Sequence, residues 1–114
     1  MHEMSIAQSM LAIVLEEAGT HGLKSLSRIH IKVGELTAVV PEALEFCFGV
    51  IAEGTPAEGA FLEIELVPAQ ARCNACARGF RFQGPLPTCP NCGGPGVITG
   101  GEELLVEFIE GEEE

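Results

Sequence analysis

Residues 73–92 read CNACARGFRFQGPLPTCPNC, and this stretch decides the fold of the part of the chain around it. Two Cys-x-x-Cys pairs lie at its ends, separated by twelve residues, which is enough for a hairpin to bring the two turns face to face. Four thiolates at such turns form a tetrahedral metal centre, and zinc is the usual ion. The sequence therefore predicts one zinc ion, with four ligands: Cys73, Cys76, Cys89 and Cys92.

Three alternatives compete with zinc: disulfides, a thioredoxin-like redox pair and a rubredoxin-like iron centre. Five cysteines, four of them in pairs, fit metal binding in a reducing compartment better than a disulfide framework. A redox pair needs a Cys-x-x-Cys at the start of a helix, which the Gly/Pro-rich context does not offer. A closed four-cysteine site has no open position for a substrate water, so we interpret it as structural and not catalytic.

Two helices are predicted before residue 60. Ser5-Ile6-Ala7-Gln8 has the form of a capping box and predicts the start of a helix, which Gly19 and Gly22 end. Pro41 is suited to the first position of a second, largely apolar helix, because its missing N–H would be unpaired there. Gly54 is expected to end that helix.

Strand patterns lie between and after these helices. In residues 27–36, apolar side chains alternate with polar ones, and residues 61–67 repeat the pattern. Between these strands and the C-terminus, cysteine, glycine and proline become frequent, which indicates a separate small module. Alternation returns at residues 104–108, so the chain is expected to re-enter the first sheet as a last strand, followed by a solvated tail at residues 111–114.

Composition limits the class of protein. At 114 residues, with 46% hydrophobic and 20% charged residues, the chain should fold as one compact domain with a small attached module. A net charge of -11 argues against binding nucleic acid or anionic membranes, although RNA binding near Arg72, Arg78 and Arg81 is kept as a minor alternative. The apolar stretch 10–15 is too short to span a bilayer and no cleavable leader precedes it, so we expect a cytoplasmic protein.

The opening Met1-His2-Glu3 has a specific metal chemistry. The Met1 amine, the deprotonated His2 amide nitrogen and the His2 imidazole can close two chelate rings on one metal ion. The Glu3 amide nitrogen or carboxylate can supply a fourth donor. Four such donors in a plane suit Ni(II) or Cu(II) better than Zn(II). The alternative is that His2 and Glu3 are solvated residues at a frayed end.

Taken together, these segments resemble the HypA/HybF family of hydrogenase nickel-insertion proteins. The resemblance is carried by MHEMSIAQSM at the start, by IHIKVGELTAVVPEALEFCFGVIAEGTPAEGAFLEIE at residues 29–65, and by CNAC and CPNC. It extends over essentially the whole chain. The family resemblance implies an α+β fold, with two helices packed on a small three-stranded mixed sheet and an inserted zinc-ribbon-like module.

The resemblance also implies a function and a domain organisation. The chain would be a nickel metallochaperone and not an enzyme, with a nickel-binding domain at 1–68 plus 99–114 and a zinc-binding domain at 69–98. Met1, His2 and Glu3 would bind Ni(2+) as transferable cargo, and the four cysteines would hold Zn(2+) structurally. The implied partners are a HypB-type GTPase and the large-subunit precursor of [NiFe]-hydrogenase.

Alternatives to this function are delivery to urease and a zinc-ribbon adaptor that binds proteins without nickel transfer. Three further residues with metal-binding side chains are assigned no role in metal binding. We expect His21 and His30 to be structural or solvated, and Cys47 to be a small buried apolar residue.

Overall fold

The central element of the first domain is strand β1 (Leu23–Gly34), in a computed structural model that describes residues 2–113. It pairs in parallel with β2 (Phe61–Val67) and antiparallel with β6 (Leu104–Glu113). The strand order β2-β1-β6 confirms the predicted three-stranded mixed sheet. The sheet joins segments far apart in sequence, since β6 returns after the cysteine-containing module.

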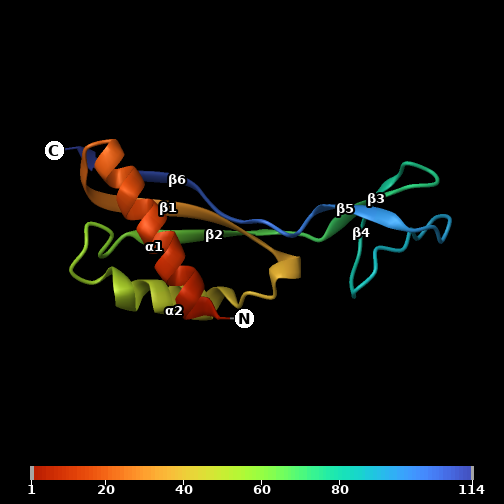
Figure 1. Ribbon diagram of the computed structural model, residues 1–114, viewed down its shortest axis with the longest axis horizontal. Helices are drawn as coiled ribbons and strands as arrows, with labels where there is room; N and C mark the ends of the chain where they lie inside the picture. Colours follow the sequence, from red (N-terminus) through yellow and green to blue (C-terminus); the bar gives the residue numbers. More distant parts are fainter. Residues whose placement is uncertain (1, 114) are drawn as a thin grey trace.

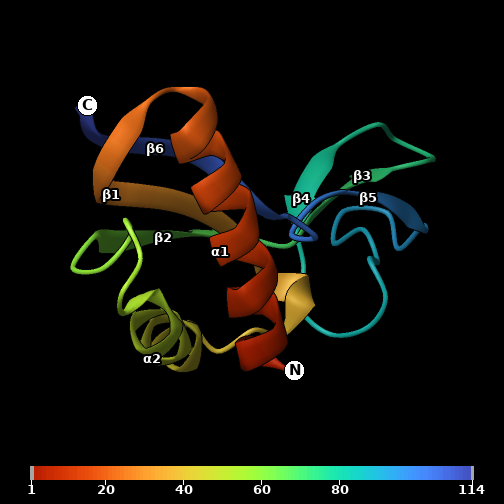
Figure 2. The ribbon, with the colours of Figure 1, turned by 60° about the vertical axis from the view of Figure 1, so that its left-hand side comes forward.

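Two helices, α1 (Glu3–Thr20) and α2 (Pro41–Ala52), cover one face of this sheet, as Figures 1 and 2 show from two sides. Alternate β1 residues face them and are fully buried, in agreement with the predicted period of two. Burying each such aliphatic side chain contributes about 1.5–3 kcal/mol. The core residues from the three elements are Leu26, Ile29, Ile31 and Val33 on β1, Ala7, Met10, Val14 and Ala18 on α1, and Leu44, Phe48 and Ala52 on α2. Neither helix is long and apolar enough to cross a membrane.

A second small sheet extends from one end of the first domain and gives the molecule its elongated shape of 56 × 25 × 16 Å (Figure 1). It contains β3 (Gln70–Cys73), β4 (Gly79–Arg81) and β5 (Gly96–Gly100) in the order β4-β3-β5. Both pairs are antiparallel. Strand β5 continues two residues beyond position 98, where the sequence places the module boundary.

The two chain crossings between the domains pack against the short 3-10 helix η1 (Glu35–Thr37). The Glu35 carboxylate accepts a hydrogen bond from the Ala69 N–H at 2.6 Å, and the Leu36 N–H donates to the Gly101 carbonyl at 2.8 Å. At Gly34 a Cβ atom would lie 2.0 Å from the Gly101 oxygen, so only glycine permits this approach. The junction is therefore a packed contact and not a loose linker.

The start of α1 differs from the prediction. The helix begins at Glu3, two residues before the expected capping box, with His2 as the N-cap and the Ile6 N–H bonded to the His2 carbonyl at 3.1 Å. Ser5 and Gln8 are exposed helical residues that make no capping bond. Glu3 explains the earlier start, because its carboxylate lies in the first turn, where the helix dipole favours negative charge.

The C-terminal strand also differs from the prediction. Residues 111–113 were expected to be solvated tail, yet β6 runs to Glu113, opposite Leu23, and β1 correspondingly begins four residues earlier than expected. Strict alternation also fails, because a β-bulge between Val106 and Phe108 turns Phe108 to the outer face of the sheet and Ile109 to the core.

Candidate metal centres

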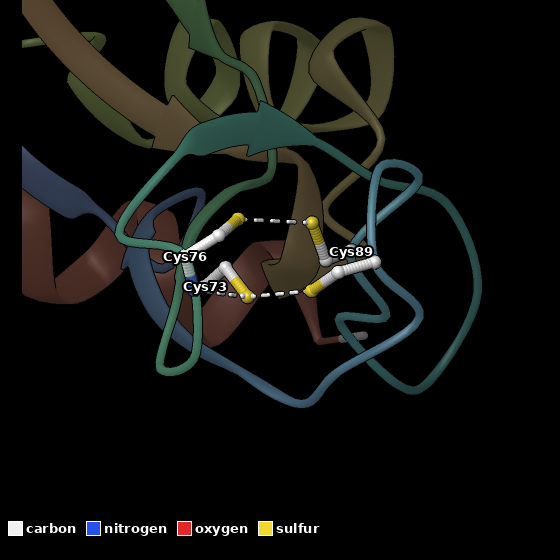
Figure 3. A group of neighbouring side chains, drawn as sticks. Cys73, Cys76 and Cys89 are labelled. Atoms are coloured by element: carbon white, nitrogen blue, oxygen red, sulfur yellow. Dashed lines mark hydrogen bonds between the residues drawn. The ribbon is translucent and has the colours of Figure 1, made fainter.

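The four cysteines of the second module converge as the sequence predicts. The sulfur of Cys73 lies 3.4 Å from that of Cys92, and the sulfurs of Cys76 and Cys89 lie 3.8 Å apart. Figure 3 shows Cys73 and Cys76 on one turn with their sulfur atoms facing the turn that carries Cys89. All four sulfurs lie within 4.8 Å of one another.

Two turns of nearly identical geometry hold these sulfurs. In the first, the Ala77 N–H donates to the Cys73 carbonyl at 3.0 Å; in the second, the Gly93 N–H donates to the Cys89 carbonyl at 2.8 Å. Both residues adopt positive φ, 62° at Ala77 and 74° at Gly93. Glycine adopts this conformation without cost, whereas the alanine is strained, which is consistent with a turn that its ligands hold in place.

Backbone N–H groups directed at sulfur favour the thiolate form. The Cys76 N–H is the main cause that lowers the pKa of Cys73 to about 6, and the Cys92 N–H lowers the pKa of Cys89. At Cys92 the Gly94 N–H lowers the pKa, but hydrogen bonds to the Cys73 and Cys89 sulfurs outweigh it and raise the pKa to about 11. Four sulfurs this close therefore cannot all ionise unless a cation balances them.

The donor set fits a structural metal ion. Four sulfurs around zinc at about 2.3 Å are about 3.8 Å apart, close to the separations found here. A disulfide needs two sulfurs at about 2.05 Å, and all four cysteines are free thiols. Neither Cys-x-x-Cys opens a helix, which argues against the thioredoxin-like alternative. Zinc and iron share this geometry, so the geometry identifies a four-thiolate metal site and not the metal.

The second candidate metal site is the predicted nickel site, Met1-His2-Glu3, at the N-terminus of α1. Met1 lies outside the described residues. His2 is exposed directly before the helix, and Glu3 is its first residue. The backbone N–H groups of a first turn have no partner inside the helix, so nitrogen atoms near His2 and Glu3 are free of helical hydrogen bonds.

The Glu3 side chain has a structural partner. Its Oε2 accepts the N–H of Val40, the N-cap residue of α2, at 3.0 Å, and this bond is the main cause that lowers the Glu3 pKa. The carboxylate thus joins the N-terminal ends of the two helices. The Glu3 backbone N–H also faces this carboxylate and is the second cause of its lowered pKa, so nickel binding through either Glu3 donor would replace an existing contact.

The remaining histidines and Cys47 lie away from these centres. His21 is the C-cap residue of α1, with its Nε2 3.3 Å from Glu17, and Cys47 is half-buried and packs against the core. His30 lies on the outer face of β1 and bonds to Glu63 and Glu65 of β2. The alternation of Glu63 and Glu65 was visible in the sequence, but only the strand register places them beside His30.

Comparison with known proteins agrees with this arrangement. The family model described as "Hydrogenase/urease nickel incorporation, metallochaperone, hypA" matches residues 1–111. A hydrogenase maturation factor HypA from Desulfitobacterium hafniense is 40% identical over 114 residues, covering 99% of this chain and 100% of that protein. The HypA of Geobacter sulfurreducens is 44% identical over 111 residues, covering 96% of this chain and 98% of the relative.

Solved structures support the same fold. The solution structure of the Ni metallochaperone HypA from Helicobacter pylori superposes with a TM-score of 0.72 at 24% identity, covering all of both chains. A second solution structure of a HypA protein gives a TM-score of 0.74 at 23% identity, covering 99% of this chain and 98% of the other. These likenesses confirm the predicted fold class, and the sequence matches establish the family. The chain belongs to the HypA family of hydrogenase/urease nickel-incorporation metallochaperones.

Proposed function

We propose that this metallochaperone carries Ni(II) at its N-terminus and delivers it during maturation of [NiFe]-hydrogenase. The donors are the Met1 amine, the His2 amide nitrogen and imidazole, and the Glu3 amide nitrogen. The observation that carries this proposal is the exposed His2 directly before the first turn of α1, where backbone nitrogens lack helical partners. Four nitrogen donors suit square-planar Ni(II).

The same proposal divides the chain into a nickel-binding domain at 1–68 plus 99–114 and a zinc-binding domain at 69–98. Zinc at the four cysteines is structural, because a closed tetrahedral thiolate site offers no exchange position. Nickel at the chain end is exchangeable, because its donors can leave one at a time. The protein forms and breaks no covalent bond of a substrate, as expected of a metallochaperone family.

The proposed recipient is the large-subunit precursor of [NiFe]-hydrogenase, with a HypB-type GTPase as the delivery partner in the cytoplasm. The relatives' names, hydrogenase maturation factor, support this choice, whereas the family description also includes urease. The net charge of -11 favours partners other than nucleic acid.

A nickel titration tests the N-terminal site. We expect one Ni(II) to bind at this site in the protein with a free Met1 amine, and none at this site in His2→Ala or after two residues are added before Met1. Binding should weaken on acidification, because the amide proton must leave and the imidazole must be neutral. His21→Ala is the matched control, since His21 is an exposed histidine at the other end of α1.

The absorption of Ni(II) in the visible region reports the planar nitrogen geometry. Unchanged nickel stoichiometry in His2→Ala and in the extended protein would refute the N-terminal site. A native protein that binds no nickel at its N-terminus would instead favour the adaptor function.

A further inference from the structure

The outer face of the first sheet, turned away from α1 and α2, carries an organised group of polar side chains around His30. The His30 side chain is only 11% exposed, although in residues 2–113 both helices lie on the opposite face (Figures 1 and 2). Its ring stacks on Phe108 with centroids 4.8 Å apart and planes 7° from parallel. The β-bulge in β6 makes this contact possible, because it turns Phe108 outward opposite His30.

Both ring nitrogens of His30 face carboxylates. Nδ1 is hydrogen-bonded to Glu63, and Nε2 lies 2.9 Å from Oε1 of Glu65. A third carboxylate, Glu107 of β6, approaches from the other side, and one ligand atom each from His30, Glu65 and Glu107 lie within 4.8 Å of one another. Three strands thus contribute one donor each to a common point.

The charges around this point do not balance. Lys32 Nζ lies 2.9 Å from Oε2 of Glu107, and Arg28 Nε lies 2.7 Å from Oε1 of Glu110. Hydrogen bonds from Glu63 and Glu65 raise the pKa of His30, so without a metal the charged ring is favoured and three cations face four carboxylates. A metal ion that replaces the proton on Nε2 leaves two cations facing four carboxylates, a net charge of 2 - 4 = -2, which one divalent cation would neutralise. The four carboxylates are Glu63, Glu65, Glu107 and Glu110.

We propose that His30 Nε2, Glu65 and Glu107 bind a divalent transition-metal ion such as Zn(II) or Ni(II), at a site separate from both the cysteines and the N-terminus. Two ligands at about 2.1 Å and a right angle are about 3.0 Å apart, close to the 2.9 Å between His30 Nε2 and Glu65 Oε1. A mixed imidazole and carboxylate donor set suits these ions better than Mg(II) or Ca(II).

The surrounding groups have defined roles in this site. With a metal bound, the Glu63 carboxylate would accept the His30 Nδ1–H and leave Nε2 for the metal, as carboxylates behind metal-binding histidines do. Lys32 occupies one oxygen of Glu107 and leaves the other for the metal. Water molecules complete the coordination, since three ligands converge here among the residues that the structure describes.

The test uses the full chain with the cysteine site loaded with zinc and with His2→Ala, so that the result does not depend on the N-terminal nickel site. Zn(II) and Ni(II) are titrated separately into this protein and into versions that also carry His30→Gln, Glu65→Gln or Glu107→Gln. We expect one additional equivalent in the parent, no such binding in His30→Gln, and a tenfold or greater loss of affinity in each glutamine variant of a glutamate ligand. Glu63→Gln should weaken binding by about 10–100-fold.

Glu110→Gln is the matched control, because it removes a carboxylate of the same face that bonds only to Arg28. In parallel, paramagnetic broadening by Ni(II) should appear first at the backbone amides of residues 30, 65 and 107. Absence of an additional equivalent in the parent would overturn the proposal and leave His30 as a charged partner of the two glutamates. Equal binding by the parent and His30→Gln, both with unchanged circular dichroism and zinc content, would also overturn it.

Discussion

Replacing Glu35 by alanine should loosen the junction between the two domains. The Glu35 carboxylate accepts the N–H of Ala69 at 2.6 Å, and Ala69 is only 3% exposed. A hydrogen bond to a charged group contributes about 1.5–3 kcal/mol. Because Glu35 itself is exposed, solvent screening places the value at the lower end, about 1.5 kcal/mol. Since 1.4 kcal/mol corresponds to a factor of ten, the Ala69 amide should exchange about tenfold faster.

Amide hydrogen exchange measured residue by residue is the assay for Glu35→Ala. The increase should be confined to the junction around Ala69 and Gly101, while amides of the β1 core, such as that of Ile31, keep their protection. Glu35→Gln retains an oxygen acceptor and should lose less. Glu102→Ala removes a nearby exposed carboxylate and is the matched control. Unchanged exchange at Ala69 in Glu35→Ala, or equal effects of Glu35→Ala and Glu102→Ala, would refute the reasoning.

Two further predictions concern the same junction and the cysteine site. In thermal melts, Gly101→Ala should destabilise the protein by about 2–3 kcal/mol, because Gly101 has φ +106° and a Cβ there would lie 2.7 Å from the Ala69 Cα. Gly100→Ala is the control and should have little effect, because the nearest atom to a Cβ at that position is 3.6 Å away. Cys89→Ser, or a strong chelator, should release the metal and unfold residues 70–100 while the first domain stays folded. The reason is that structural zinc contributes about 10–16 kcal/mol of apparent binding energy. Well-dispersed amide signals from residues 70–100 in the metal-free protein would contradict this prediction.

Local patterns in the sequence were sufficient for much of the fold. The alternation at β2 predicted its bounds of residues 61–67, and Pro41 marked the first residue of α2. Patterns of this kind depend on residues that are close together in the sequence. The predicted start of α1 was wrong because Glu3 favours an earlier first turn. The Val40 N–H holds the Glu3 carboxylate there, through a contact between residues far apart in sequence. The extension of β6 was missed because a strand of glutamates gains its order from pairing with β1.

The metal sites differ in the same way. The cysteine cluster was predictable, because the spacing within each Cys-x-x-Cys pair forms a turn and a single hairpin between the pairs brings the two turns together. The group around His30 was not predictable, because its members come from three strands whose register is set by the core. The bulge that exposes Phe108 shifts this register by one residue, and a sequence pattern does not reveal such a shift.

The segment 35–40 contacts both the N-terminus of α1 and the second module, through the Val40–Glu3 bond at one end and the Glu35–Ala69 bond at the other. Ni(II) bound through the Glu3 amide would rearrange the first helical turn, and the Glu3 carboxylate would move relative to Val40. We therefore expect metal loading at the N-terminus to reach the junction through these six residues. Glu3→Ala imitates the loss of the Val40 bond and should by itself raise exchange at Ala69.

A double-mutant comparison isolates this route. If segment 35–40 transmits the effect, Glu3→Ala and Glu35→Ala should be non-additive at Ala69, because both release the same segment. Glu16→Ala, which removes an exposed carboxylate from the far end of α1, should leave Ala69 unchanged. Strictly additive effects on Ala69 exchange would show that the two bonds act independently. Segment 35–40 would then not transmit the effect of nickel binding to the second module, and any coupling between the two sites would have to pass through the sheet.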